Sequence, residues 1–252
     1  MVKEIPAIWE DYKIFDAHIH IGDYFDINAR FPASELFAYL DRYNISRAAL
    51  SAVTKNIPGD NELVLDAMKR EPDRIVALAH IDPTSADALE QMESAISKGF
   101  RGLKLHPHYD AYMVFDSRII FPLLERAAKH RLPVLIHTGT PPMTTPIHVG
   151  LLAQHFPDVN FIAAHMGLVD SSLEAVEAGK MAENIYMDMT AASITSILED
   201  AIDRLGPHRF VWGTDAPYIS FISEFFKLLS LRVSDEVKRQ ILWENPVRIY
   251  RL

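Results

Sequence analysis

The sequence predicts an α/β fold, a (β/α)8 TIM barrel, from three observations. Short apolar runs recur along the whole chain, and each precedes a longer segment of helical periodicity, giving eight such pairs. Consecutive strand starts lie about 24 to 33 residues apart, which suits a helix that returns the chain to a parallel neighbour. No Gly-x-Gly-x-x-Gly motif follows the first run, so a dinucleotide-binding sheet is not favoured.

Each expected element is defined by its own pattern. The expected strands are 14–21, 47–53, 75–81, 102–106, 133–137, 161–165, 185–189 and 210–214. The expected helices are 33–43, 60–70, 85–98, 117–130, 147–155, 171–182, 194–205 and 221–231. Loops 22–32 and 106–116 follow strands, and therefore belong to the face of a barrel that holds substrates. Segment 234–252 begins with a helix-start signal and is expected to pack as helices closing one side.

Composition narrows the possible functions. A chain of 252 residues without a linker or low-complexity stretch predicts a single domain over 1–252. Its 25 Lys and Arg against 34 Asp and Glu give a net charge of −9, which disfavours nucleic acid and anionic membranes as partners. We therefore expect a small-molecule substrate and a cytoplasmic location, with a homo-oligomer left open. The absence of cysteine leaves His, carboxylates or a modified Lys as metal ligands.

The first expected strand carries two histidines two residues apart, His18 and His20. Residues i and i+2 of a strand point to the same face, so both imidazoles can converge on one point, as a transition metal requires. The alternative is an alternating strand whose histidines face solvent.

Polar side chains end five of the eight expected strands. They are His18 and His20 on the first, Lys104 and His106 on the fourth, His137 on the fifth, His165 on the sixth and Asp215 on the eighth. The carboxyl ends of barrel strands converge on one axis, so these groups predict a metal site with an open position for water or substrate. Other roles remain open: His137 as a core histidine, Asp215 as a helix cap, and His165 bonded to a loop carbonyl.

Several motifs resemble the amidohydrolase superfamily of metal-dependent barrels, in its amidohydrolase-related branch of hydrolases and aromatic-acid decarboxylases. The resemblance covers nearly the whole chain. It rests on Asp16-Ala-His-Ile-His20, Gly102-Leu-Lys-Leu-His-Pro107, Ile136-His-Thr138, Ala164-His-Met-Gly167, Gly213-Thr-Asp-Ala-Pro217 and Glu244-Asn-Pro-Val-Arg-Ile-Tyr250. It implies that His18, His20, His137 and Asp215 bind the metal, and that His165 binds metal or polarises the substrate.

Lys104 distinguishes two kinds of site within that superfamily. In some branches a lysine at the end of the fourth strand is carboxylated and bridges two metals. The Leu-Lys-Leu-His pattern resembles the branch with one metal, so we expect one divalent ion per chain, zinc or alternatively manganese, and an unmodified Lys104. The rim location predicts substrate contacts for Lys104, His106, His108, Tyr109 and Arg30.

These observations lead to three functional hypotheses. The first is a metal-dependent hydrolase of an ester, lactone or amide bond, which uses a metal-activated water, Asp215 as proton acceptor and His165 to stabilise the oxyanion. The second is a metal-dependent nonoxidative decarboxylase of an aromatic or unsaturated acid. The third is a barrel that binds metal without catalysis. The chain is shorter than we expect for decarboxylases of this branch, so the hydrolase is favoured.

Overall fold

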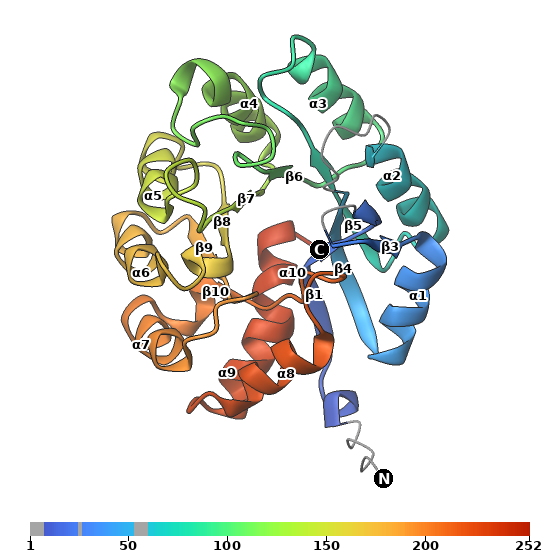
Figure 1. Ribbon diagram of the computed structural model, residues 1–252, viewed down its shortest axis with the longest axis vertical. Helices are drawn as coiled ribbons and strands as arrows, with labels where there is room; N and C mark the ends of the chain where they lie inside the picture. Colours follow the sequence, from blue (N-terminus) through green and yellow to red (C-terminus); the bar gives the residue numbers. More distant parts are fainter. Residues whose placement is uncertain (1–7, 25–26, 53–59) are drawn as a thin grey trace.

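The computed structural model describes residues 8–24, 27–52 and 60–252, and there eight strands form one sheet of neighbouring parallel pairs. Figure 1 shows the strands at the centre and the helices around them. The predicted (β/α)8 barrel is therefore confirmed. In sheet order the strands are β1 (Ile14–His20), β4 (Ile45–Ser51), β5 (Ile75–His80), β6 (Gly102–Leu105), β7 (Val134–His137), β8 (Phe161–Ala164), β9 (Ile185–Asp188) and β10 (Phe210–Val211).

A helix follows each barrel strand, as the periodicity predicts. These helices are α1 (Ala33–Arg42), α2 (Asp60–Arg70), α3 (Ala88–Ser97), α4 (Ser117–His130), α5 (Pro146–His155), α6 (Ser172–Met181), α7 (Thr195–Leu205) and α8 (Phe221–Ser230). All of these helix ends but one lie within one residue of the predicted ends, and the exception is the start of α3, at Ala88 instead of position 85. None of the helices among the described residues is long and apolar enough to cross a membrane.

Three predicted elements need correction. Loop 22–32 contains a two-stranded antiparallel hairpin, β2 (Gly22–Tyr24) paired with β3 (Ala29–Phe31), because alternate residues of this short segment bond across it. The eighth strand stops at Val211 rather than at 214, because its pairing with β9 ends where Val211 meets Asp188. The second strand runs from Ile45 to Ser51, and position 53 of its expected range lies outside the described residues.

Backbone hydrogen bonds between β1 and the segment that follows β10 close the barrel. The amide of Ala17 donates to the carbonyl of Trp212 at 2.9 Å, directly after β10. Farther along, the amide of Asp215 donates to the carbonyl of His18 at 2.7 Å, and that of His20 donates to Ala216 at 2.9 Å. The segment that follows β10 thus continues alongside β1 to its end.

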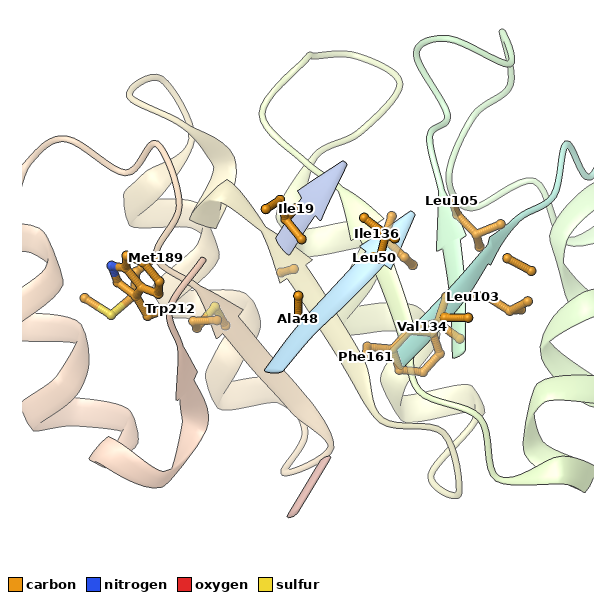
Figure 2. Close-up of a cluster of buried hydrophobic side chains, with 14 of the residues drawn as sticks. Ile19, Ala48, Leu50, Leu103, Leu105, Val134, Ile136, Phe161, Met189 and Trp212 are labelled. Atoms are coloured by element: carbon orange, nitrogen blue, oxygen red, sulfur yellow. The ribbon is translucent and has the colours of Figure 1, made fainter. Parts of the chain in front are cut away.

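Alternating side chains divide the core into two layers. Residues such as Leu103, Val134 and Ile136 face outward and pack with the apolar faces of the helices, as Figure 2 shows for the strand side of this layer. Their neighbours, among them Leu135 and Ile162, pack together inside the barrel. Both faces of the sheet are covered, which explains the continuously apolar strand sequences.

The C-terminal segment closes one end of the barrel, the end at which the strands begin, as predicted. It forms α9 (Asp235–Arg239), a π-helical turn (Gln240–Glu244) and α10 (Asn245–Tyr250), and Ser234 caps α9 by accepting a hydrogen bond from the amide of Val237. Figure 1 shows α10 lying across the barrel. The ring of Tyr250 stacks on Phe15 at 5.7 Å within the interior cluster. Apolar side chains therefore fill this end, and the opposite end is left for polar groups.

Gly213 offers a test of how closely β1 and the segment after β10 must approach. A Cβ atom there would lie 2.7 Å from both Cβ and the amide nitrogen of His18, and 2.9 Å from the hydroxyl of Thr190. We expect Gly213→Ala to lower the free energy of unfolding in urea by about 1–3 kcal/mol, the usual cost of overpacking.

The matched control is Gly150→Ala in α5. The added methyl would meet the sulfur of Met181 at 2.6 Å, and that flexible side chain can move aside. This variant should stay within about 1 kcal/mol of the wild type, since alanine also favours the helix. Equal stability of both variants would show that the barrel does not need the close approach at Gly213.

Candidate metal centre and active site

A cavity of ≈ 300 Å³ lies at the carboxyl ends of the barrel strands. Polar groups gather here because the apolar interior layer occupies only the opposite part of the barrel. The lining residues are His20, Lys104, His106, Tyr109, His137, His165, Leu168, Ala191, Asp215, Tyr218 and Ile219. Most of the groups that end strands in the sequence thus meet in one place, as the barrel geometry predicts.

A β-bulge in β1 turns its histidines into the barrel. Asp16 pairs with Ala48 and Ile19 pairs with Leu50, so three steps along β1 match two along β4. Phe15 before the bulge and Ala17 within it pack in the interior cluster, whereas Ile19 after the bulge packs outward. The positions that face inward therefore change from odd to even residue numbers. Without this extra residue His18 and His20 would share the outward face of Ile14, because regular strands alternate strictly.

His18 is fully buried and has a partner at each ring nitrogen. Its Nδ1 lies 2.7 Å from Oδ2 of Asp188, at the end of β9. Its Nε2 lies 2.8 Å from Nζ of Lys104, on β6. Burial first, and then the nearby Lys104, lower the pKa of His18 well below its usual value, so the ring is neutral near pH 7.

His20 and Asp215 lie side by side in the site and contact each other directly. Nε2 of His20 lies 2.9 Å from Oδ1 of Asp215, and Nε2 of His18 lies 3.6 Å from the same oxygen. The other nitrogen of His20 faces the hydroxyl of Ser51 at 3.0 Å. Burial alone would raise the pKa of Asp215, but His18 and the hydrogen-bonded His20 outweigh it and hold this pKa below its usual value. Asp215 is therefore ionised.

The carboxylate of Asp16 holds Thr214 and thereby positions the adjacent residue, Asp215. It accepts hydrogen bonds from the hydroxyl of Thr214 at 2.6 Å, the amide of Thr214 at 3.0 Å and the amide of His18 at 3.2 Å. Burial raises the pKa of Asp16 to about 7, although these hydrogen bonds oppose the shift. Asp215 adopts a left-handed backbone conformation with φ 55°, which is uncommon outside glycine and is held here by its neighbours.

His165 also departs from regular strand geometry. It begins a short 3-10 turn after β8, has φ 63°, and its Nδ1 lies 3.3 Å from the carbonyl oxygen of Thr190. A carbonyl only accepts, so Nδ1 carries the hydrogen and Nε2 presents its lone pair. The bond to a loop carbonyl that the sequence left open as an alternative is present. It leaves Nε2 of His165 suited to metal contact or to accepting a proton.

His137 lines the cavity but points its Nε2 elsewhere. That nitrogen lies 2.9 Å from the hydroxyl of Thr140, and the ring lies 4.9 Å from that of His165. His106 stacks between His137, at 4.1 Å, and Tyr109, at 3.9 Å. The three rings therefore form a stack that lines one side of the cavity, with His106 in its middle.

The other predicted substrate contacts divide into two groups. Lys104, His106 and Tyr109 line the cavity, whereas His108 is exposed and outside the lining. Arg30 is also outside: its side chain is 80% exposed and its Nε pairs with Asp23 at 3.2 Å across the β2–β3 hairpin. The structure does not bring Arg30 or His108 to the cavity because the hairpin and the loop after β6 turn them toward solvent.

Asp188 and Ser51 are site residues that the sequence analysis missed. Asp188 ends β9 and lies within the expected strand 185–189. Its position at the end of an apolar run is the same signal that singled out Asp215. Ser51 ends β4 next to the segment 53–59, outside the described residues, and a strand-end serine is too common a feature to be read as a site.

The described residues include two groups whose nitrogen and oxygen atoms lie within 4.8 Å of one another. One is His18, His20 and Asp215, and the other is His18, His165 and Asp188. Two imidazoles and a carboxylate form a donor set that suits a divalent transition metal. Three of the four predicted ligands thus meet in the first group, and His137 is in neither, because its Nε2 faces Thr140.

Comparison with known proteins agrees with the fold and identifies the family. The chain matches the Amidohydrolase family over residues 15–252 and therefore belongs to it. It is 24% identical over 291 residues to 4-sulfomuconolactone hydrolase of Hydrogenophaga intermedia, an alignment covering 97% of this chain and 89% of that protein. The protein is thus an enzyme of the amidohydrolase family, as the motifs predict.

Two solved structures are similar in fold. An uncharacterized TIM-barrel protein from Bordetella bronchiseptica has a TM-score of 0.81 at 19% identity, covering 95% of this chain and 99% of that one. A dihydroxybenzoic acid decarboxylase from a Polaromonas species, with bound manganese and the inhibitor 2-nitroresorcinol, has a TM-score of 0.75 at 15% identity, covering 96% and 97%. At these identities the likeness concerns the fold alone.

We expect the purified protein to bind about one divalent ion per chain, and the double variant His18→Ala, His20→Ala to lose it, since two preorganised imidazoles form the core of the donor set. Elemental analysis after loading with Zn²⁺ and desalting measures this. The control, His148→Ala with His155→Ala, removes two histidines of α5 outside the cavity and should keep the ion. A fully loaded His18, His20 double variant would place the metal elsewhere.

Proposed function

We propose that the protein is a metal-dependent hydrolase that opens a lactone or a related ester or amide bond in a small acidic molecule. The convergence of His18, His20 and Asp215 beside the buried ammonium of Lys104 is the observation that carries this proposal. The similarity to a sulfomuconolactone hydrolase over nearly the whole chain supports it. A cytoplasmic location is part of the same proposal.

We assign the metal to His18, His20 and Asp215, with His137 as a fourth ligand once its ring leaves Thr140. Zinc is the proposed ion, because imidazole and carboxylate donors suit it, and manganese is the alternative. When bound, the divalent ion supplies a Lewis acid that lowers the pKa of water and polarises the scissile carbonyl.

Asp215 is the proposed proton acceptor for the attacking water. Its depressed pKa keeps the carboxylate ionised at neutral pH, so it can take the proton and later return it to the leaving oxygen or nitrogen. His165 is the neighbouring second acceptor, because its Nε2 lone pair faces the site. The oxyanion role expected for His165 from the sequence would require this nitrogen to be protonated first, and burial lowers its pKa.

Lys104 is the proposed contact for an acidic group of the substrate. In the structure its Nζ donates a hydrogen bond to the lone pair of His18 Nε2. Burial lowers the pKa of Lys104 to about 8, although Asp215 and Asp188 act to raise it. An ion and an ammonium cannot share that lone pair, so ion binding releases the ammonium for a new partner. A carboxylate or sulfonate of the substrate would satisfy it inside the cavity.

Nonoxidative decarboxylation of an aromatic acid is the second candidate. The rings of His106 and Tyr109 line the cavity, and aromatic rings of this kind can pack edge to face against an aromatic substrate. Screening the zinc-loaded protein against lactones, esters, amides and aromatic acids separates the two reactions. Ring opening without carbon dioxide release supports the hydrolase, and carbon dioxide release without hydrolysis replaces it with the lyase.

Asp215→Asn separates metal contact from proton transfer. The amide keeps one oxygen ligand but loses the basic carboxylate, so turnover should fall by about 10²–10⁴-fold at saturating zinc while metal content falls only modestly. Steady-state rates and elemental analysis on the same sample measure both. Asp110→Asn, which alters a carboxylate that pairs with His80 outside the cavity lining, is the control. Near-full turnover of the Asp215→Asn variant would rule out the proposed chemistry.

Lys104→Met replaces the buried ammonium with an apolar side chain of similar length. We expect KM for an acidic substrate to rise about 10-fold or more, since a hydrogen bond to a charged group contributes roughly 1.5–3 kcal/mol. The KM of a neutral ester analogue should change much less. Equal effects of Lys104→Met on both substrates would contradict the assigned role. An intact mass of the wild-type protein that shows carbon dioxide added to Lys104 would also contradict it.

A further inference from the structure

We propose that Asp188 is a positioning residue, whose carboxylate fixes the tautomer of His18 so that Nε2 presents a lone pair to the metal. The residue is not part of the cavity lining, and it acts through His18. This inference rests on the metal site of the proposed function, but not on the bond that the enzyme cleaves.

The hydrogen-bond partners of Asp188 carry the argument. Its Oδ2 faces Nδ1 of His18 at 2.7 Å and the amide of His165 at 3.4 Å. Its Oδ1 accepts from the amide of Thr190 at 2.9 Å and from the hydroxyl of the same residue. All four partners can donate, and a fully buried carboxylate with four donors around it is an acceptor on both oxygens.

Both nitrogens of His18 are thereby assigned. Because Asp188 only accepts, Nδ1 must carry the hydrogen, and because the ammonium of Lys104 only donates, Nε2 must carry the lone pair. The two partners lie on different strands, β9 and β6, and require the same tautomer. That tautomer leaves Nε2, the nitrogen on the Asp215 side, ready to bind a cation.

The same carboxylate also reaches the second histidine of the site. It accepts from the amide of His165, whose left-handed backbone would otherwise leave that amide without a strand partner, and it holds Thr190, whose carbonyl faces Nδ1 of His165. Partners of this kind typically change metal affinity 10- to 100-fold when removed. Asp188 therefore couples the orientation of His18 to that of His165.

Replacement of Asp188 by asparagine tests the donor pattern with little change of shape. The amide NH₂ must face either Thr190 or His18, and each side presents donors. The backbone amide of Thr190 always carries its hydrogen and can only donate. His18, by contrast, can move its hydrogen from Nδ1 to Nε2 and then accept at Nδ1. We expect the NH₂ to settle against His18, and the lone pair of Nε2 to be lost.

The first measurement uses the metal-free wild-type protein with ¹⁵N-labelled histidine. Two-bond ¹H–¹⁵N correlation spectra distinguish the protonated from the unprotonated ring nitrogen, and the His18→Gln variant assigns the signals. We expect Nδ1 of His18 to be protonated and Nε2 to be unprotonated. A protonated Nε2 in the wild type would overturn the proposal, and this arm does not depend on the folding of any Asp188 variant.

The second measurement is zinc affinity by competition with a chromogenic chelator. Asp188→Asn should bind zinc about 10- to 100-fold more weakly than the wild type, with the tautomer of His18 reversed in the metal-free spectrum. Asp110→Asn, a change in another His–Asp pair, should bind zinc as the wild type does. Unchanged zinc affinity of the Asp188→Asn variant would overturn the proposal. Failure of the wild type to hydrolyse any substrate while it still binds zinc would contradict the proposed function alone.

Discussion

The join between β1 and the segment after β10 is the constraint on which the site depends. Backbone bonds from Asp215 to His18 and from His20 to Ala216 close the barrel, and the carboxylate of Asp16 holds Thr214 against β1. The last barrel strand therefore delivers Asp215 to the histidines of the first. Asp16 and Thr214 are 198 residues apart in the sequence, yet the hydrogen bond between them joins the two segments at one side of the cavity.

The chemistry of the site follows from the polar layer above an apolar one. Buried apolar side chains fill the lower barrel, so the charged and imidazole groups at the rim lie in a poorly hydrated environment. Burial lowers the pKa of His18, His20 and His165 and keeps these rings neutral, the form that binds metals. Burial also tends to raise the pKa of Asp215, which would favour its protonated form. Its contacts with His18 and His20 outweigh burial and hold this pKa below its usual value. Neutral ligands and one ionised carboxylate are thus present together at neutral pH.

The sequence predicted the barrel because eight apolar runs followed by helical segments allow few other folds, and because strand ends converge in that fold. Orientation was harder to predict. The pairing of His18 with His20 needed only period-two alternation, but their inward direction depends on the bulge at Ala17 and His18, which pairing with β4 reveals. The ring direction of His137 depends on Thr140, and the exposure of Arg30 depends on the β2–β3 hairpin. These are tertiary contacts that no local pattern contains.

The most direct test of the central claim is a crystal structure of the zinc-loaded protein, with anomalous diffraction data collected on both sides of the zinc absorption edge. The account predicts one anomalous peak per chain, about 2.0–2.2 Å from Nε2 of His18, Nε2 of His20 and a carboxylate oxygen of Asp215. A peak between His18, His165 and Asp188, or two peaks bridged by a carboxylated Lys104, would contradict it.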